Sequence, residues 1–426
     1  MRVLFTVTGW KGVYFSLIPL GWALQAAGHE VRVACPPSQA GALGGAGLVP
    51  APVLEDFDTM RLERLARYAE AVRSPGTFTG PPPLHPLTGA PVKSLAEFDV
   101  AVQEPRIRAA HHAVLGRNCD AAAAFARVWR PDLVVHDLMT PEGVLAARVA
   151  GVPAVFHSPG MFGSQEAALA DPTGAFERHG VAPLGTTPPG QSAPGPAGAG
   201  RGAVEYTIDP TPGSIAPPHG NALTLPVRYV PYNGPGHQEP WLLEPAPRTR
   251  VCLVWSNSAR NIFGTEAPVL RHAVDAVLAT GAELLLTASA EQAEALGPMP
   301  GSVRVLRDFP LRLLLPGCDA LIHQGSVNPM MTGLGVPQLA LGLTDDGVEI
   351  GRRFSRGGSG VALAGLEATA EDIHRAVARI VGDPEPRAAA AALEQENAQR
   401  PPLGRVVHRL ERLARDGGLT EQDLSD

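Results

Sequence analysis

The sequence predicts an α/β fold built from two doubly wound parallel-sheet domains. Short apolar runs rich in β-branched residues, such as RVLFTV (2–7), alternate with segments of helical periodicity. This alternation occurs in two series, and the second series begins at VCLVWSNS (251–258). The length of 426 residues also fits two or three domains.

The first series opens with a strand, a helix and a second strand. In LIPLGWALQAAGHEV (17–31), apolar residues recur at helical spacing, and Gly28 stands where the helix is expected to end. VRVAC (31–35) follows as a strand, so the order implies a βαβ unit and a parallel sheet. Further along, we expect a helix over about 107–128 and a strand in PDLVVHD (131–137).

The second series contains five further expected strands. They are ELLLTAS, VRVLRDFP, ALIHQG, PQLALG and GVALAG, at 283–289, 303–310, 320–325, 337–342 and 360–365. Thr369 is predicted to cap the helix EDIHRAVARIV, with Asp372 three residues further on. A last helix, rich in Arg, is expected over about 404–416.

The expected boundaries follow from shifts in composition. They give an N-terminal domain at 1–228, a linker at 229–248, a C-terminal domain at 249–403, and a C-terminal helix and tail at 404–426. The segment 184–203 is rich in Pro, Gly and Ala. It is expected to form a flexible loop, because it cannot bury enough apolar surface to order itself.

Composition and charge disfavour several classes of protein. The net charge of −7 makes nucleic acid an unexpected partner. The four cysteines show no C-x-x-C spacing, so reduced thiols are expected rather than disulfides or a zinc site. No segment reaches transmembrane length, and the N-terminus lacks the pattern of a signal peptide. We therefore expect a cytoplasmic protein without a membrane span.

Candidate site residues are those that follow the expected strands, because ligands of doubly wound sheets bind outside the carboxyl ends of the strands. No G-x-G-x-x-G follows the first strand and no Walker sequence is present, which argues against dinucleotide and P-loop sites. The strand ends of interest are residues 8–14, 136–137, 157–162, 255–258, 308–310 and 324–328.

Four segments of the chain resemble GT-B glycosyltransferases, in particular the bacterial group that transfers deoxysugars to antibiotics. They are PLGWALQAAGHEVRVACPP (19–37), RPDLVVHDLMTPEGVLAARVAGVPAV (130–155), RYVPYNG (228–234), and LLLPGCDALIHQG with GLGVPQLALGLTDD (313–325 and 333–346). The resemblance covers nearly the whole chain. It implies two Rossmann-like domains that face each other across a cleft. The N-terminal domain would bind the acceptor, and the C-terminal domain would bind the nucleotide sugar.

The resemblance also implies a reaction. An acceptor hydroxyl attacks the anomeric carbon of the sugar, and a base on the N-terminal domain removes its proton. A helix N-terminus and backbone donors stabilise the leaving diphosphate, so the reaction needs no metal ion. The implied co-substrate is a dTDP- or UDP-sugar, and no other cofactor is expected.

The base is the main departure from the family pattern. The family usually places a histidine six residues before the proline of its PL-x-WAL helix, and counting back from Pro19 gives Val13. Asp137 matches the acidic position that usually orients this histidine, so it is the expected catalytic residue. The alternative is that Asp137 caps the helix that begins three residues later.

The acceptor is expected to contact residues from three of these strand ends. His136 is expected to pack at its strand end rather than to act as the base, and core packing is an equal alternative for Met161 and Phe162. The expected acceptor-binding residues are Trp10, Val13, Tyr14, His136, Met161 and Phe162.

The donor site is expected at Ser256, Phe309, His323, Gln324, Gly325, Ser326, Val327, Asn328, Asp345 and Asp346. The resemblance places the phosphates at Gln324, where the family has a histidine; Gln324 can donate a hydrogen bond but carries no charge. Asn328 and Pro329 are predicted to be the N-cap and first residue of a short helix, and Pro329 lacks an N–H for a phosphate.

Two further donor positions depart from the family. The acid–Gln pair that binds the sugar hydroxyls becomes Asp346 and Gly347, so the amide is lost. Asp308 stands where the family often has an aromatic residue, and the neighbouring Phe309 could take its place. For Ser256, Asp345 and Asp346, an ordinary polar turn is the alternative interpretation.

The sequence therefore predicts a glycosyltransferase of antibiotic biosynthesis, of the metal-independent hexosyltransferase type. It would transfer a deoxysugar to a small apolar natural product. The departures at Val13, Asp308, Gln324, Pro329 and Gly347 motivate a second hypothesis, a repurposed GT-B homologue that binds or rearranges a biosynthetic intermediate or serves as an accessory protein. A nucleotide-sugar epimerase is less favoured, because the N-terminal signatures are closer to the transferases. A homodimer is compatible with both hypotheses.

Overall fold

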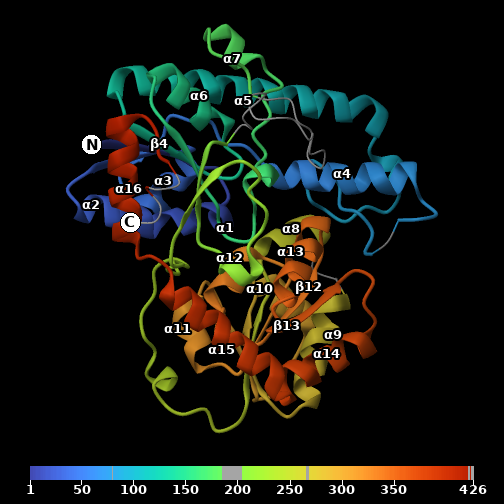
Figure 1. Cartoon of the computed structure of the whole chain (residues 1–426). Helices are drawn as coiled ribbons and strands as arrows, with labels where there is room; N and C mark the ends of the chain where they lie inside the picture. The colour runs from blue at the N-terminus through green and yellow to red at the C-terminus, as the bar shows by residue number, and fades with distance from the viewer. Residues whose placement is uncertain (79, 185–203, 265–267, 421–422, 424–426) are drawn as a thin grey trace. The chain divides into compact units, whose positions relative to one another are not determined.

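The computed structural model describes residues 1–78, 80–184, 204–264, 268–420 and 423. These residues form two compact units, each built on a parallel sheet (Figure 1). Unit 1 comprises Met1–Phe57, Arg108–Tyr232 and Asn397–Asp426, and unit 2 comprises Asp58–Ile107 and Asn233–Glu396. The prediction of two parallel-sheet α/β domains is confirmed.

Unit 1 contains a seven-stranded sheet in the order β3-β2-β1-β4-β5-β6-β7. The register pairs Phe5 with both Val33 and Val135, so the central strand β1 has neighbours on both sides. Three strands, β3, β6 and β7, were not predicted. The strands are β1 (Arg2–Thr6), β2 (Glu30–Ala34), β3 (Pro50–Ala51), β4 (Leu133–His136), β5 (Ala154–His157), β6 (Tyr206–Asp209) and β7 (Leu223–Pro226).

Helices cover both faces of this sheet. On one face, Phe5 and Val33 pack with apolar residues of α2 (Ile18–Ala26) and α16 (Leu403–Asp416). On the other face, Leu4 and Val134 pack against α5 (Val100–Trp129) and α6 (Pro141–Ala150). Other helices of this unit are α1 (Lys11–Tyr14), α3 (Pro37–Gly45) and α7 (Ala175–Arg178).

The C-terminal helix α16 belongs to unit 1, although it is the last helix of the chain. Val406, Leu410 and Leu413 are buried in the same apolar cluster as the residues of α2. Figure 1 shows α16 in red beside α2 in blue. The end of the chain thus returns to cover the sheet with which the chain begins.

Unit 2 contains a six-stranded sheet in the order β10-β9-β8-β11-β12-β13. All six strands are parallel, and each coincides with an expected strand. They are β8 (Arg250–Val254), β9 (Glu283–Thr287), β10 (Val303–Leu306), β11 (Ala320–His323), β12 (Gln338–Gly342) and β13 (Gly360–Ala364).

The helices of unit 2 pack on both faces of its sheet. The helices α9 and α14 lie side by side and bury Val274 and Val377 in one apolar cluster (Figure 1). From residue 257 on, the described helices of this unit are α8 (Asn257–Phe263), α9 (Pro268–Ala279), α10 (Ala290–Leu296), α11 (Leu311–Leu314), α12 (Val327–Thr332), α13 (Asp345–Ser355), α14 (Ala370–Gly382) and α15 (Pro384–Gln399).

One helix from the first quarter of the chain, α4 (Thr59–Arg73), packs in unit 2. The Arg64 guanidinium donates to the Asn261 carbonyl of α8 at 3.1 Å, and the Arg67 guanidinium lies 4.5 Å from the centre of the Phe263 ring. These contacts explain why packing groups residues 58–107 with unit 2, whereas the sequence-based boundaries placed them within 1–228.

Two predicted helix boundaries are confirmed by backbone geometry. Gly28 follows the end of α2 with φ of 83°, a left-handed conformation that glycine adopts without strain. The Thr369 hydroxyl accepts the Asp372 N–H at 3.1 Å, which makes the predicted cap of α14. The predicted flexible loop at 184–203 lies, apart from Leu184, outside the described residues.

Among the described residues, no helix is both long enough and apolar enough to span a lipid bilayer. The cysteines are free, and Cys35, Cys119 and Cys252 are buried.

The contact between α6 and the sheet of unit 1 gives a first testable prediction. A methyl group on Gly143 would clash with the Thr6 hydroxyl and lie 2.8 Å from the His136 Cβ. Gly143→Ala should therefore lower the stability of the protein by about 1–3 kcal/mol. Thermal or urea unfolding measures this change.

Gly44 in α3 provides the matched control. A methyl group there meets no atom of the described residues within 4 Å. Gly44→Ala should therefore raise stability by about 0.4–1 kcal/mol through the unfolded chain. Equal effects of the two substitutions would contradict the described packing.

Candidate functional site

In unit 1, the carboxyl ends of four neighbouring strands bring polar residues to one edge of the sheet. The strands β1, β4, β5 and β6 are adjacent and parallel, so the loops after them lie next to each other. These loops carry Thr8, Asp137, Ser158 and Thr211. The sequence predicted three of these loops, but not the loop after β6.

Asp137 connects the loop after β1 to the loop after β4. Its carboxylate is fully buried and accepts the N–H of Thr8 at 2.7 Å and the N–H of Met139 at 2.9 Å. Burial raises the pKa of the Asp137 carboxyl, whereas the two N–H donors favour its charged form and oppose this rise. The N-cap of α6 is Thr140. Asp137 therefore holds two loops together and is not itself the cap of the helix.

The expected acceptor residues divide between two apolar clusters. Trp10, Val13 and Phe162 pack in one cluster, together with Met139 and Leu169. Tyr14 packs in the cluster of α2 instead, and its hydroxyl donates to Gln39 at 3.0 Å. The geometry therefore brings Trp10, Val13 and Phe162 together, and it turns Tyr14 away from them.

His136 packs at the end of β4. Its ring lies on Phe156, with 5.8 Å between the ring centres, and its Nδ1 donates to the Asp137 carbonyl at 3.0 Å. Burial lowers the pKa of His136 to about 4, so the imidazole is neutral at pH 7. The ring is thus enclosed at the end of β4.

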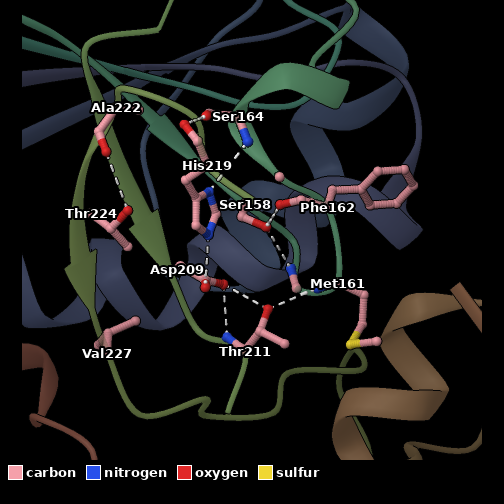
Figure 2. A network of polar contacts seen from close by, with 12 residues as sticks. Ser158, Met161, Phe162, Ser164, Asp209, Thr211, His219, Ala222, Thr224 and Val227 are labelled. Atoms are coloured by element: carbon pink, nitrogen blue, oxygen red, sulfur yellow. Dashed lines mark hydrogen bonds and ion pairs between the residues drawn. The ribbon is translucent and has the colours of Figure 1, made fainter. Parts of the chain in front are cut away.

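Met161 lies in a strained loop held by the loop after β6. Its φ of 61° is uncommon for a residue other than glycine, and such conformations cost about 1–3 kcal/mol. The Met161 N–H donates to the Thr211 hydroxyl at 2.9 Å, as Figure 2 shows. Sequence analysis missed Asp209, Thr211 and His219 of this network. The only signal for them was the polar end of YTID, a four-residue strand flanked by proline- and glycine-rich segments.

Glu142 is a second buried carboxyl that the sequence analysis missed. It is 5 % exposed, and its Oε2 has no hydrogen-bond partner among the described residues. Burial raises the pKa of Glu142 to about 8, and the neighbouring Asp137 carboxylate contributes to the rise. Glu142 therefore carries a proton at neutral pH.

In unit 2, Ser256 and Gln324 contact each other at the ends of the adjacent strands β8 and β11. The Ser256 N–H donates to Oε1 of the Gln324 side chain at 3.3 Å, and Nε2 of the same side chain donates to the Ser256 hydroxyl. The same hydroxyl accepts the Ala259 N–H at 3.3 Å and so caps α8. The two predicted donor residues are therefore brought together.

His323 has a structural position in the same turn. Its Nδ1 accepts the Gly325 N–H at 3.1 Å, so its Nε2 carries the proton and donates to Gln338 at 3.0 Å. Burial lowers the pKa of His323 to about 4. His323 is thus a neutral, fully buried link between β11 and β12.

Gly325 and Gly347 bring two backbone segments unusually close together. Gly325 has φ of 77°, and a methyl group on it would lie 2.6 Å from the Gly347 carbonyl oxygen and 2.8 Å from the Gly347 Cα. A side chain at Gly347 would also crowd the Thr344 hydroxyl. Gly347 replaces the glutamine of the family pattern. It stands where α13 approaches the turn after β11 closely, so a longer side chain would be crowded there.

The short helix after this turn begins earlier than predicted. Its N-cap is Ser326 and its first residue is Val327, so the prediction of Asn328 and Pro329 as cap and first residue is wrong. Pro329 stands third in the helix, where its missing N–H breaks no intrahelical bond. Asn328 accepts a hydrogen bond from Asn233 at 2.6 Å.

The remaining donor residues lie at other strand ends of unit 2. Asp345 and Asp346 are exposed in the first turn of α13, where negative charge is favourable. Phe309 is half-buried in the cluster of Leu311 and Leu314, beside Asp308 with φ of 48°. β10 is the edge strand, two positions from β8, so Phe309 and Ser256 follow strands that are not neighbours.

The chain matches known family models over most of its length. The model described as "Erythromycin biosynthesis protein CIII-like, N-terminal domain" matches residues 22–255. The corresponding C-terminal model matches residues 271–413. Together the two models cover every strand of both sheets except β1, which precedes residue 22.

Similar proteins span the whole chain. A 10-deoxymethynolide desosaminyltransferase of Streptomyces venezuelae is 33% identical over 97% of each chain. An L-demethylnoviosyl transferase of Streptomyces niveus is 34% identical over 94% of this chain and 95% of the relative.

Solved structures show the same fold. Spinosyn forosaminyltransferase SpnP aligns with a TM-score of 0.71 and 28% identity, over 97% of this chain and 99% of that one. Glycosyltransferase VinC in complex with dTDP aligns with a TM-score of 0.70 and 27% identity, over 98% and 100%.

The two parallel-sheet units have the GT-B fold of the glycosyltransferases to which the chain is similar. The chain belongs to the erythromycin biosynthesis protein CIII-like family, and it is a glycosyltransferase.

The buried carboxyl of Glu142 predicts a specific pH dependence of stability. Between its ordinary value of 4.5 and about 8, the folded chain holds the proton and the unfolded chain has lost it. Stability should therefore fall as the pH rises through this range, by up to about 1.4 kcal/mol per pH unit. Glu142→Gln is neutral at every pH and should remove this part of the dependence.

The measurement is urea unfolding of both proteins at about pH 5 and about pH 8. The variant should gain stability relative to the original chain at the higher pH, on the order of a few kcal/mol. Parallel pH profiles of the two proteins would show that Glu142 does not hold its proton in the folded state.

Proposed function

We propose that this glycosyltransferase transfers a deoxysugar from a dTDP-sugar to an apolar natural product. The main support is the similarity over the full chain to transferases named for desosaminyl and demethylnoviosyl groups. The similarity to VinC, whose solved structure is a complex with dTDP, supports the choice of nucleotide. No metal ion and no further cofactor take part in the proposed reaction.

In this proposal, unit 1 binds the acceptor. The cluster of Trp10, Val13 and Phe162 supplies apolar surface for a natural product of low polarity. His136, the last residue of β4, packs on Phe156 and supports this edge, and Met161 fixes the backbone beside Phe162. Tyr14 takes part only indirectly, through the packing of α1.

Unit 2 binds the nucleotide sugar in this proposal. Gln324 and Ser256 would donate hydrogen bonds to the diphosphate, and Gly325 with Ser326 and Val327 would bring the backbone close to it. Asp346 and Asp345 would bind sugar hydroxyls, and Phe309 would contact the base. His323 and Asn328 hold the turn through Gln338 and Asn233.

Asp137 is the proposed catalytic carboxylate of unit 1. As a general base it would need the loops around it to open, because its side chain is fully buried and an acceptor hydroxyl must come within hydrogen-bond distance of it. As a positioning residue it would fix the loop of residues 8–14 without contact to the substrate. The present geometry favours the second role.

Asp137→Asn separates these two roles. The amide keeps the size but replaces one acceptor oxygen by a donor, so we expect kcat/KM to fall by about a hundredfold or more. A positioning role predicts that the remaining activity keeps the original pH profile. Loss of the acidic limb of the profile would instead identify Asp137 as the base, and unchanged activity would contradict both roles.

Gln324 gives a prediction for nucleotide binding. Gln324→Glu places a carboxylate where the diphosphate is expected, so dTDP should bind about tenfold more weakly or worse. Gln324→His provides the residue of the family pattern and should bind dTDP at least as well as the original chain. Isothermal titration measures both, and equal affinities of the Glu variant and the original chain would place the phosphates elsewhere.

The function itself is tested by incubating the chain with a dTDP-deoxysugar and a panel of polyketide aglycones. We expect a product heavier by one sugar that requires both substrates, detected by mass spectrometry. Binding of dTDP without any product would favour the repurposed homologue. The proposal also includes a cytoplasmic location. It is compatible with a monomer or a homodimer, and analytical ultracentrifugation distinguishes the two.

A further inference from the structure

The loop of residues 158–166, which follows β5, is bonded to the loop that follows β6 by a buried polar network (Figure 2). The Thr211 N–H and hydroxyl both donate to Asp209 Oδ1, at 2.8 and 2.6 Å. Because its hydrogen is used in this way, the Thr211 oxygen is available as an acceptor for the Met161 N–H at 2.9 Å. Asp209 thus acts on Met161 through Thr211.

His219 makes the second connection between the two loops. Its Nδ1 accepts the Ser164 N–H at 3.3 Å, so its Nε2 carries the proton and donates to Asp209 Oδ2 at 3.0 Å. The Ser164 hydroxyl also donates to the His219 carbonyl at 2.5 Å. The buried Asp209 carboxylate therefore holds the loop of residues 158–166 with both oxygens, one through Thr211 and the other through His219.

The backbones of the two loops also meet directly. A methyl group on Gly163 would overlap the Pro218 carbonyl oxygen, so only glycine fits between them. The Ser158 hydroxyl accepts the Gly160 N–H and donates to the Phe162 carbonyl. The backbone of residues 160–164 is thus bonded at almost every residue.

These hydrogen bonds fix the backbone of Met161, which is strained, next to the apolar side chain of Phe162. Met161 keeps its left-handed backbone because Thr211 holds its N–H. Figure 2 shows the side chains of Met161 and Phe162 pointing away from the polar network. Phe162 is partly exposed and packs with Trp10 and Val13, the proposed acceptor residues.

We propose that Thr211, held by Asp209 and His219, is a positioning residue that determines acceptor specificity by fixing the backbone at Met161 and thus the place of Phe162. This inference rests on the proposed function, since it assumes that Phe162 contacts the acceptor. It differs from a purely structural role, because the network acts on one strained residue beside the apolar cluster.

Thr211→Val tests the inference, since it removes the hydroxyl and preserves the shape of the side chain. We expect the KM for the acceptor to rise by about tenfold, while the KM for the dTDP-sugar changes by less than about twofold. The relative rates with acceptors of different size should also become more equal. Thr211→Ser keeps the hydroxyl and should restore the original values.

Thr224→Val is the matched control. Among the described residues, the Thr224 hydroxyl bonds only the Ala222 carbonyl, at 3.4 Å, and Figure 2 shows Thr224 apart from Met161. Its loss should leave the acceptor KM unchanged. If Thr211→Val does not fold, Thr211→Ala at the same position replaces it, with the same expected rise.

Three results separate the possible failures. An acceptor KM that stays within about twofold in the Thr211→Val protein overturns the inference. An equal rise in the KM for the acceptor and in the KM for the dTDP-sugar also overturns the inference, because it indicates a general disturbance of the fold. If the original chain forms no product with any aglycone, the proposed function itself fails, and the inference fails with it.

Discussion

The alignment of parallel strand ends is the constraint on which both candidate sites depend. In each unit, every strand runs in the same direction, so loops that are distant in sequence meet at one edge. In unit 1, the Asp137 carboxylate uses this proximity to bond the loop after β1, and Thr211 uses it to bond the loop after β5. In unit 2, Ser256 and Gln324 meet for the same reason.

Three residues that depart from the family pattern fit the packing or hydrogen bonding around them. Gly347 lies against Gly325, where a longer side chain would crowd the turn after β11. Gln324 is neutral and bonds Ser256, which keeps the turn closed without a charge. Val13 contributes to the same apolar cluster as Trp10 and Phe162. These substitutions change the chemistry available at the strand ends but leave the fold intact.

The sequence predicted all six strands of unit 2 and four of the seven strands of unit 1, because apolar runs that alternate with periodic helices leave little ambiguity. It missed β6 and β7, which are four residues each and lie between proline-rich segments, and it therefore missed Asp209, Thr211 and His219. It misplaced the start of α12, because Asn328 before Pro329 resembles a cap and the tertiary fold starts the helix at Val327.

The burial of Asp137 and Glu142 depends on packing from several elements and has no local signal in sequence.

The central claim is that the turn after β11 binds the diphosphate of a dTDP-sugar. A crystal structure of the chain with dTDP tests this most directly. We expect the diphosphate within hydrogen-bond distance of the Gln324 side chain and the backbone N–H groups that follow it. A diphosphate bound at another strand end, or dTDP absent from the crystal at saturating concentration, would contradict this claim.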